Sequence, residues 1–175
     1  MVEKKNRAAK SGKARFARRW HQPAALGAVS ADKTYLTDGE VRGIVNESLT
    51  GKFWPSFNLY LGDAEYYCPP KRDVEEILEL SKVDRYQWTE DLFDCDDFAH
   101  VLKAHFAEAA YKDGQRRKAH CFGVVWGSLP DAHAINWVIT DDRQLWFIEP
   151  QSVARREDKI FSPRKNDRDI YFMLC

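Results

Sequence analysis

The sequence lacks the features of a disulfide-rich, zinc-knuckle or membrane-spanning protein. Its four cysteines form no CxxC pair and follow no secretory signal, which favours a reducing, cytoplasmic location. No apolar run approaches the roughly 20 residues that a membrane-spanning helix needs. Neither sign of charge is in excess, because 27 Lys and Arg residues balance 27 Asp and Glu residues. The whole molecule therefore has no net field that would attract a polyanion.

The apolar content of the sequence is enough for one folded domain. Hydrophobic residues make up 44% of the 175 residues, as in ordinary globular proteins. Residues 1–34 are basic and hold few large apolar side chains, so we expect a flexible N-terminal arm there. Its charges could contact a polyanion. Residues 35–175 then form the domain.

The apolar spacing changes along the chain from helical to strand-like. Residues three and four apart predict helices over 38–49, after Pro70, and from about Asp94 to Gly114. Aromatic stretches broken by proline, at 53–60 and 66–70, predict packed loops or short edge strands. Apolar runs at 121–126, 134–140, 145–148 and 170–175 predict strands. Helices followed by an antiparallel sheet make an α+β fold.

Cys95 is the first candidate for chemistry, because it falls in the first turn of the third predicted helix. Unpaired N–H groups and the helix dipole at that end stabilise a thiolate, the form of cysteine that attacks electrophiles. His133 opens one predicted strand and Glu149 ends the next, so a hairpin would bring them together. We therefore predict Cys95 as the nucleophile, His133 as the general base and Glu149 as the group that orients the base.

The pairing of the two strands decides whether His133 and Glu149 can meet. A turn on residues 141–144, with Thr140 opposite Leu145, pairs Asn136 with Glu149 and leaves His133 on the other sheet face. A three-residue loop or one bulge shifts the pairing by one residue and puts Glu149 on the face of His133. We predict this irregularity, without which Asn136 would need reconsideration.

The remaining catalytic positions stay open at this point. An oxyanion hole would use the backbone N–H of Cys95 and one donor from the preceding segment, either Gln87 or Trp88. His120 is the rival base. On general grounds a cysteine on a buried helix stripe packs rather than reacts, and only the company of His133 and Glu149 favours chemistry at Cys95.

Acidic residues crowd the predicted nucleophile. Neighbouring carboxylates disfavour a thiolate by about one pKa unit each at close range, so a positive charge should offset them. Clustered carboxylates are the oxygen ligands that Ca²⁺ takes, although such a cluster can also be a solvated helix start. We predict a Ca²⁺ site with ligands from Glu90, Asp91, Asp94, Asp96 and Asp97.

Three sequence blocks resemble the C-terminal domain of the fairy-ring mushroom agglutinin family. They are Asp-Cys-Asp-Asp-Phe-Ala at 94–99, His-Ala-Ile-Asn-Trp at 133–137 and Phe-Ile-Glu-Pro-Gln-Ser at 147–152. The resemblance covers roughly residues 36–175 and implies a papain-like cysteine protease fold, dependence on calcium and a triad of Cys95, His133 and Glu149. It also makes Trp88 an active-site tryptophan. The sugar-binding half of that family has no counterpart in this sequence, so we expect no glycan-binding domain.

The predicted function is that of a calcium-dependent cysteine protease, a hydrolase that cleaves a protein or peptide substrate through a thioester on Cys95. One alternative is an acyl transferase of the transglutaminase type that uses the same three residues. The other is a non-catalytic binding module that calcium stabilises. Apolar aromatic loops could form the interface of a homodimer.

Overall fold

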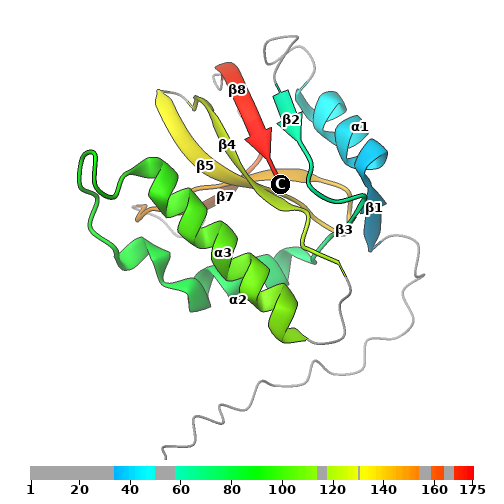
Figure 1. Ribbon diagram of the computed structural model, residues 1–175, viewed down its shortest axis with the longest axis horizontal. Coiled ribbons are helices and arrows are strands. Elements are labelled where there is room, and N and C mark those ends of the chain that lie inside the picture. The colour runs from blue at the N-terminus through cyan, green and yellow to red at the C-terminus, as the bar shows by residue number, and fades with distance from the viewer. Residues whose placement is uncertain (1–33, 50–57, 114–117, 130, 154–158, 164–167) are drawn as a thin grey trace, which may run out of the picture.

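The computed structural model describes residues 34–49, 58–113, 118–129, 131–153, 159–163 and 168–175. The predicted N-terminal arm lies outside them, apart from Thr34, as do residues 53–57 of the first aromatic stretch. The boundary between arm and domain stays a prediction. The described residues form a mixed α+β fold of helices and a six-stranded sheet (Figure 1).

The helices begin and end close to the predicted positions. Helix α1 is Asp38–Leu49, and Thr37 and Glu40 cap it reciprocally, since each backbone N–H donates to the other side chain. Helix α2 is Lys71–Ser81, directly after Pro70. Helix α3 is Cys95–Asp113, so the predicted place of Cys95 in its first turn is confirmed. A 3-10 turn at Val83–Arg85, which the apolar pattern did not predict, follows α2.

The main sheet has the strand order β2-β8-β4-β5-β6-β7. Its strands are β2 (Asn58–Tyr60), β4 (Phe122–Ser128), β5 (Ala132–Ile139), β6 (Leu145–Ile148), β7 (Ile160–Phe161) and β8 (Arg168–Leu174). Strands β1 (Tyr35–Thr37) and β3 (Glu65–Tyr67) make a separate antiparallel pair. The sheet is not wholly antiparallel as predicted, because β2 runs parallel to β8 at one edge. The two aromatic stretches thus contribute the short strands β2 and β3.

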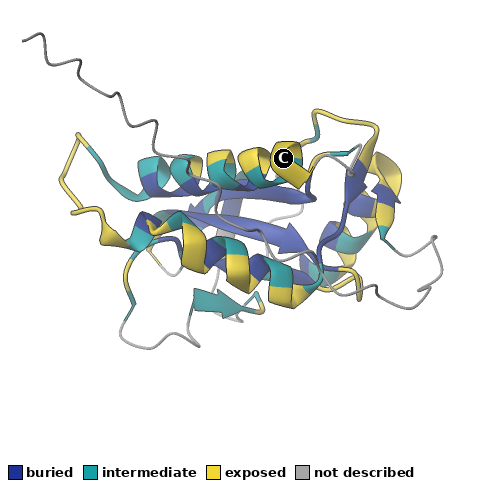
Figure 2. Cartoon of the chain, turned by 90° about the horizontal axis from the view of Figure 1, so that it is seen from below, coloured by how far each residue is buried: buried dark blue, intermediate teal, exposed yellow. Residues whose placement is uncertain are grey.

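Strand β5 is buried on both faces, and each face carries its own core. Ile135, Trp137 and Ile139 pack in the core that also holds the buried residues of α1. Asn136 and Val138 face the other way, where Val138 joins the core of α2 and α3. In Figure 2 the dark blue strands lie between helices whose outer surfaces are exposed.

Gly123 marks the tightest packing of the sheet. A Cβ on this residue would collide with the Leu174 carbonyl and with the indole of Trp137. The indole N–H of Trp137 donates to the Val124 carbonyl at 3.2 Å, which fixes the ring over β4. The centre of the sheet therefore accepts no larger residue at position 123.

None of the helices in the described part of the chain combines the length and the apolar character that crossing a membrane would require.

Candidate ligand site at the start of helix α3

Two aspartates shape the first turn of α3. Asp94 stands at the N-cap, and its backbone N–H donates to the carboxylate of Asp97 at 3.2 Å. The Asp94 carboxylate in turn accepts from the backbone N–H groups of Asp96 and Asp91. Asp91 adopts a positive φ of 56°, which lets the preceding loop turn back toward the helix. These bonds hold Cys95 at the first helical position.

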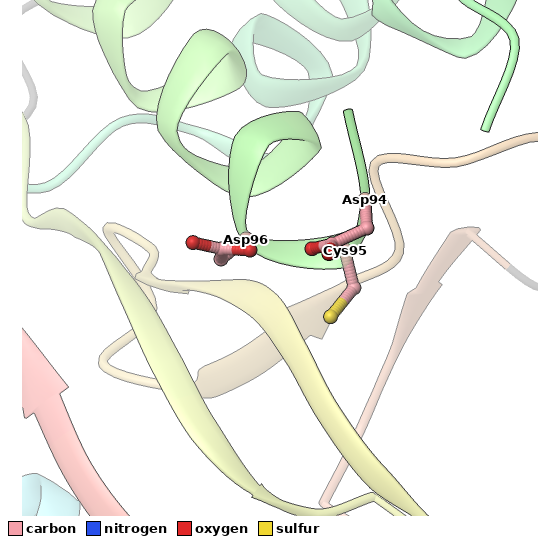
Figure 3. Close-up of side chains that lie close together, drawn as sticks. All are labelled: Asp94, Cys95 and Asp96. Carbon is pink, nitrogen blue, oxygen red and sulfur yellow. The ribbon is translucent and has the colours of Figure 1, made fainter. Parts of the chain in front are cut away.

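The surroundings of Cys95 disfavour its thiolate. Its sulfur accepts from the backbone N–H of Ala134, and the thiol donates to the carboxylate of Asp94. Burial raises the pKa of Cys95; the hydrogen bond from Ala134 opposes this rise, and the charges of Asp94 and Asp96 add to it. In Figure 3 the sulfur points away from α3, toward the sheet. The acidic surroundings thus act in the direction that the sequence predicts.

His133 and Glu149 form a direct pair. Nε2 of His133 lies 2.9 Å from Oε2 of Glu149, and the two side chains are only 22% and 18% exposed. The other oxygen of Glu149 accepts from the backbone N–H of Gln151 at 3.0 Å. The carboxylate is therefore fixed from both sides and sets the orientation of the imidazole.

The pair exists because the hairpin has the predicted irregularity. Ile139 pairs with Leu145, and the Thr140 N–H donates to the Gln144 carbonyl at 3.1 Å, so three residues form the loop. Arg143 closes it with a φ of 62°. The expected one-residue shift is confirmed, and Asn136 pairs with Ile148 instead of with Glu149.

The pair and helix α3 lie on opposite faces of strand β5. The register puts His133 and Glu149 on the face of Ile135, whereas Asn136, on the opposite face, donates to the Ala99 carbonyl of α3 at 2.9 Å. Within the described residues no hydrogen bond joins the Cys95 sulfur to His133. The sulfur reaches the backbone of β5 at Ala134 instead. The thiol–imidazole contact that activates a cysteine nucleophile is not made.

The predicted calcium ligands are only partly brought together. One oxygen each of Asp94 and Asp96 and the sulfur of Cys95 lie within 4.8 Å of one another. Asp96 shares a hydrogen bond with Asp94, and this bond raises the pKa of Asp96 and lowers the pKa of Asp94. Asp97 is engaged in the helix cap, and Glu90 and Asp91 are exposed in the preceding loop.

The two close carboxylates fit a hard cation, because each can supply an oxygen ligand and a cation would offset the repulsion between their charges. The thiol of Cys95 does not fit Ca²⁺, which takes oxygen ligands. The donor set that could hold calcium is therefore Asp94 and Asp96, with Glu90, Asp91 and Asp97 as further predicted ligands.

The loop before α3 carries the predicted oxyanion donors on its surface. Gln87 is exposed and Trp88 is 51% exposed. Hydrogen bonds between Thr89 and Phe93 close this loop, and the ring of Tyr86 packs on Phe93 at 5.0 Å. Sequence reasoning did not single out Tyr86, although its spacing of two from Trp88 in a loop is a signal for a shared aromatic surface.

His120, the rival base, is a buried residue of the core. His120 is only 4% exposed, and its Nδ1 lies 3.0 Å from the Phe106 carbonyl, among the aromatic rings of Tyr67 and Phe106. It packs under the C-terminal half of α3, away from Cys95 in the first turn of that helix.

The family described as "Agglutinin C-terminal" matches residues 66–155. The chain belongs to this family. The matched region includes α2, α3 and β4 to β6, and with them every residue of the candidate site. The resemblance that the three sequence blocks indicate is thus confirmed. No curated protein matches the chain.

Two solved structures show the same fold. One is titled "PSL1a-E64 complex", with 24% sequence identity and a TM-score of 0.67 over 81% of this chain and 51% of that one. The other is the Polyporus squamosus lectin bound to the human-type influenza-binding epitope Neu5Aca2-6Galb1-4GlcNAc, with 24% identity and a TM-score of 0.63. It matches over 81% of this chain and 50% of its own length. The chain therefore spans about half the length of these structures.

The comparisons contradict the predicted peptidase. The family is named for an agglutinin and the second structure for a lectin, and neither is named a peptidase. The terms hydrolase and cysteine protease are corrected accordingly, and the acyl transferase, as an enzyme on the same residues, is set aside with them. The physical reason lies in the site, where burial and the charges of Asp94 and Asp96 raise the pKa of Cys95, and where no hydrogen bond among the described residues joins its sulfur to His133.

The predicted partners are corrected as well. We expected a protein or peptide substrate and no glycan-binding domain, whereas the Polyporus squamosus lectin is a structure with a bound sialylated glycan. That expectation rested on the lack of a separate sugar-binding half in the sequence, and the matched part spans about half of the lectin structure.

Proposed function

We propose that this chain is a non-catalytic binding module of the agglutinin type, that calcium stabilises it, and that its ligand is a carbohydrate. The observation that carries the proposal is the pairing of Asp94 and Asp96 at the start of α3, directly after a loop with the exposed ring of Trp88. The glycan in the related lectin structure supports the class of ligand.

The chemistry of these residues suits a sugar. Carboxylate oxygens accept hydrogen bonds from hydroxyl groups, and an exposed indole offers an apolar face on which a pyranose ring can pack. Tyr86 adds a second ring with 55% of its surface exposed. Polar groups that converge beside aromatic faces are typical of sites that bind small ligands.

Calcium is part of the proposal. Asp94 and Asp96 would hold it, and its charge would offset the repulsion between their carboxylates. Because a ligand carboxylate must be deprotonated and the pKa of Asp96 is raised, calcium affinity should fall as the pH drops toward that pKa.

The finer structural predictions belong to the same proposal. We propose a papain-like arrangement, in which α3 packs on the antiparallel strands β4 and β5 with Cys95 at its first turn. Cys95, His133, Glu149, Trp88 and Gln87 stay predicted residues of the functional site. The homodimer, the contact of the basic arm with a polyanion and the cytoplasmic location also stay predictions.

The binding test uses the sialylated trisaccharide of the lectin structure and calorimetry of the full chain, with calcium and then with a chelator. Trp88→Ala should weaken binding by about tenfold or more, since a buried tryptophan contact is often worth 2 kcal/mol or so. Asp96→Asn should remove the calcium dependence. Tyr111→Ala, at an 88% exposed tyrosine on the far end of α3, is the matched control and should bind as the unaltered chain does.

Absence of binding to this glycan and to an array of neutral sugars would overturn carbohydrate as the ligand class. The non-catalytic part has its own test, the rate at which iodoacetamide alkylates Cys95. We expect slow alkylation with and without calcium, as for a protonated thiol. Fast alkylation that depends on calcium would overturn it.

A further inference from the structure

Cysteines outside the candidate site converge at the start of β4. Cys121 directly precedes this strand, and its backbone N–H donates to the Tyr67 carbonyl at 2.7 Å, which brings Cys68 beside it. Cys175 directly follows β8, whose last residue, Leu174, pairs with Val124 of β4. All belong to the core on the α1 face, and all are free thiols.

The sulfur of Cys175 contacts the backbone on both sides of Cys121. Sγ of Cys175 lies 3.8 Å from the His120 carbonyl oxygen and 3.5 Å from the Phe122 carbonyl oxygen, the residues on either side of Cys121. Its backbone N–H donates to the Tyr60 carbonyl at 3.0 Å, which fixes the residue at the end of the sheet. Cys121 is fully buried, whereas Cys175 is partly exposed.

The charges around the two thiols differ. The ammonium of Lys103 donates to the Phe122 carbonyl at 3.0 Å, the same oxygen that Cys175 contacts. A hydrogen bond from Cys121 lowers the pKa of Cys175; burial opposes this, the Lys103 charge adds to it, and Asp63 opposes it weakly. Burial raises the pKa of Cys121 well above its ordinary value. Of the two thiols, Cys175 is therefore the one whose thiolate the surroundings favour.

We propose that Cys175 and Cys121 form an oxidisable dithiol, in which Cys175 reacts with hydrogen peroxide and Cys121 completes a disulfide. The Cys175 thiolate attacks one peroxide oxygen, the O–O bond breaks, and the leaving hydroxide takes a proton to become water. The Cys121 sulfur then attacks the sulfenic acid at Cys175, the S–O bond breaks, and a second water leaves with the Cys121 proton. Each dithiol is oxidised by two electrons, and one peroxide is reduced to water.

The other cysteines fit this role less well. Cys68 is fully buried and lies beside Cys121, without the contact to the Lys103 region that Cys175 has. The pKa of Cys95 is raised by burial and by the neighbouring aspartates. A partly exposed residue whose thiol has a cation and a second thiol nearby is the arrangement in which oxidation is selective.

Trypsin separates the cysteines, so peptide mapping identifies the bond directly. Cleavage after Lys or Arg puts Cys68, Cys95, Cys121 and Cys175 on four different peptides. The full chain is treated with graded hydrogen peroxide at neutral pH, blocked with N-ethylmaleimide and mapped without reduction. We expect a linked pair of the peptides 119–143 and 169–175 at the lowest peroxide concentration that changes the map.

Variants test each assignment. Cys121→Ser should leave a sulfenic acid on Cys175 that dimedone labels, and Cys68→Ser should keep the disulfide. Lys103→Met should slow the oxidation severalfold, whereas Lys112→Met, at an exposed position of the same helix, should not. Circular dichroism checks that Cys121→Ser folds, and Cys175→Ser, at the partly exposed partner, should abolish the linked pair in any case.

The proposal is overturned if Cys68 or Cys95 oxidises first, or if Cys175 reaches only irreversible oxidation states without a disulfide. It is also overturned if Lys103→Met oxidises as fast as the unaltered chain. These outcomes are independent of carbohydrate or calcium binding.

Discussion

Asn136 joins three elements at the centre of the domain and offers a sharp test of how α3 is held. It is fully buried, and its amide donates to the Ala99 carbonyl of α3 at 2.9 Å and to the Gly123 carbonyl of β4 at 3.0 Å. Its Oδ1 is buried without a hydrogen-bond partner. An aspartate at this position would present oxygens to both carbonyls and donate no hydrogen bond while ionised.

The cost of Asn136→Asp follows from these contacts. Two lost hydrogen bonds amount to about 2 kcal/mol, and an unpaired buried carboxylate raises its pKa by about three units, which costs about 4 kcal/mol more at neutral pH. Because the folded-state pKa of the new carboxyl is raised, the protonated form contributes stability below the unfolded pKa. That contribution is lost as the pH rises through the folded pKa. The variant should therefore be least stable at neutral pH and partly recover in acid.

Urea unfolding at pH 7 and at pH 4 measures both effects. Asn136→Leu, which removes the donors but buries no charge, should lose about 2 kcal/mol or less at both pH values. Asn58→Asp, at an exposed position of β2, should change the free energy of unfolding by about 0.5 kcal/mol at most. The bridging role of Asn136 is refuted if Asn136→Asp costs no more than Asn58→Asp at pH 7.

Three further predictions concern local structure. Gly123→Ala should lower the free energy of unfolding by about 3 kcal/mol or prevent folding, whereas Gly43→Ala, in α1 with no atom near its Cβ, should raise it by about 0.5 to 1 kcal/mol. Thr37→Ala removes the capping box of α1 and should cost about 1 kcal/mol in urea unfolding. Asp94→Asn keeps an N-cap side chain but removes a charge beside Cys95, so alkylation of this thiol should become severalfold faster.

The elements with a strong local pattern could be predicted from the sequence. The apolar stripe of α3 starts at Cys95, where the helix begins. The capping signals before α1 likewise predict the bounds that this helix has. The three-residue hairpin loop could also be inferred, because only a pairing shifted by one residue puts Glu149 on the same sheet face as His133. In each case, neighbouring residues carry the signal.

The features that could not be predicted depend on contacts between distant residues. The parallel pairing of β2 with β8 joins a strand between α1 and α2 to the last strand of the sheet, and no local pattern encodes its direction. The two-residue strand β7 is too short for any periodicity. The bond from the Ala134 N–H to the Cys95 sulfur likewise arises only when α3 docks on β5.

The start of α3 shows why a helix N-terminus alone does not activate a thiol. The free N–H groups of a first turn stabilise whichever anion is nearest, and here the carboxylates of Asp94 and Asp97 occupy that position as caps. A cysteine between two capping aspartates then meets negative charge where the sequence suggested a positive dipole. Its thiol becomes a donor to Asp94. The aspartates of this first turn therefore raise the pKa of Cys95, and a cation would engage the same carboxylates.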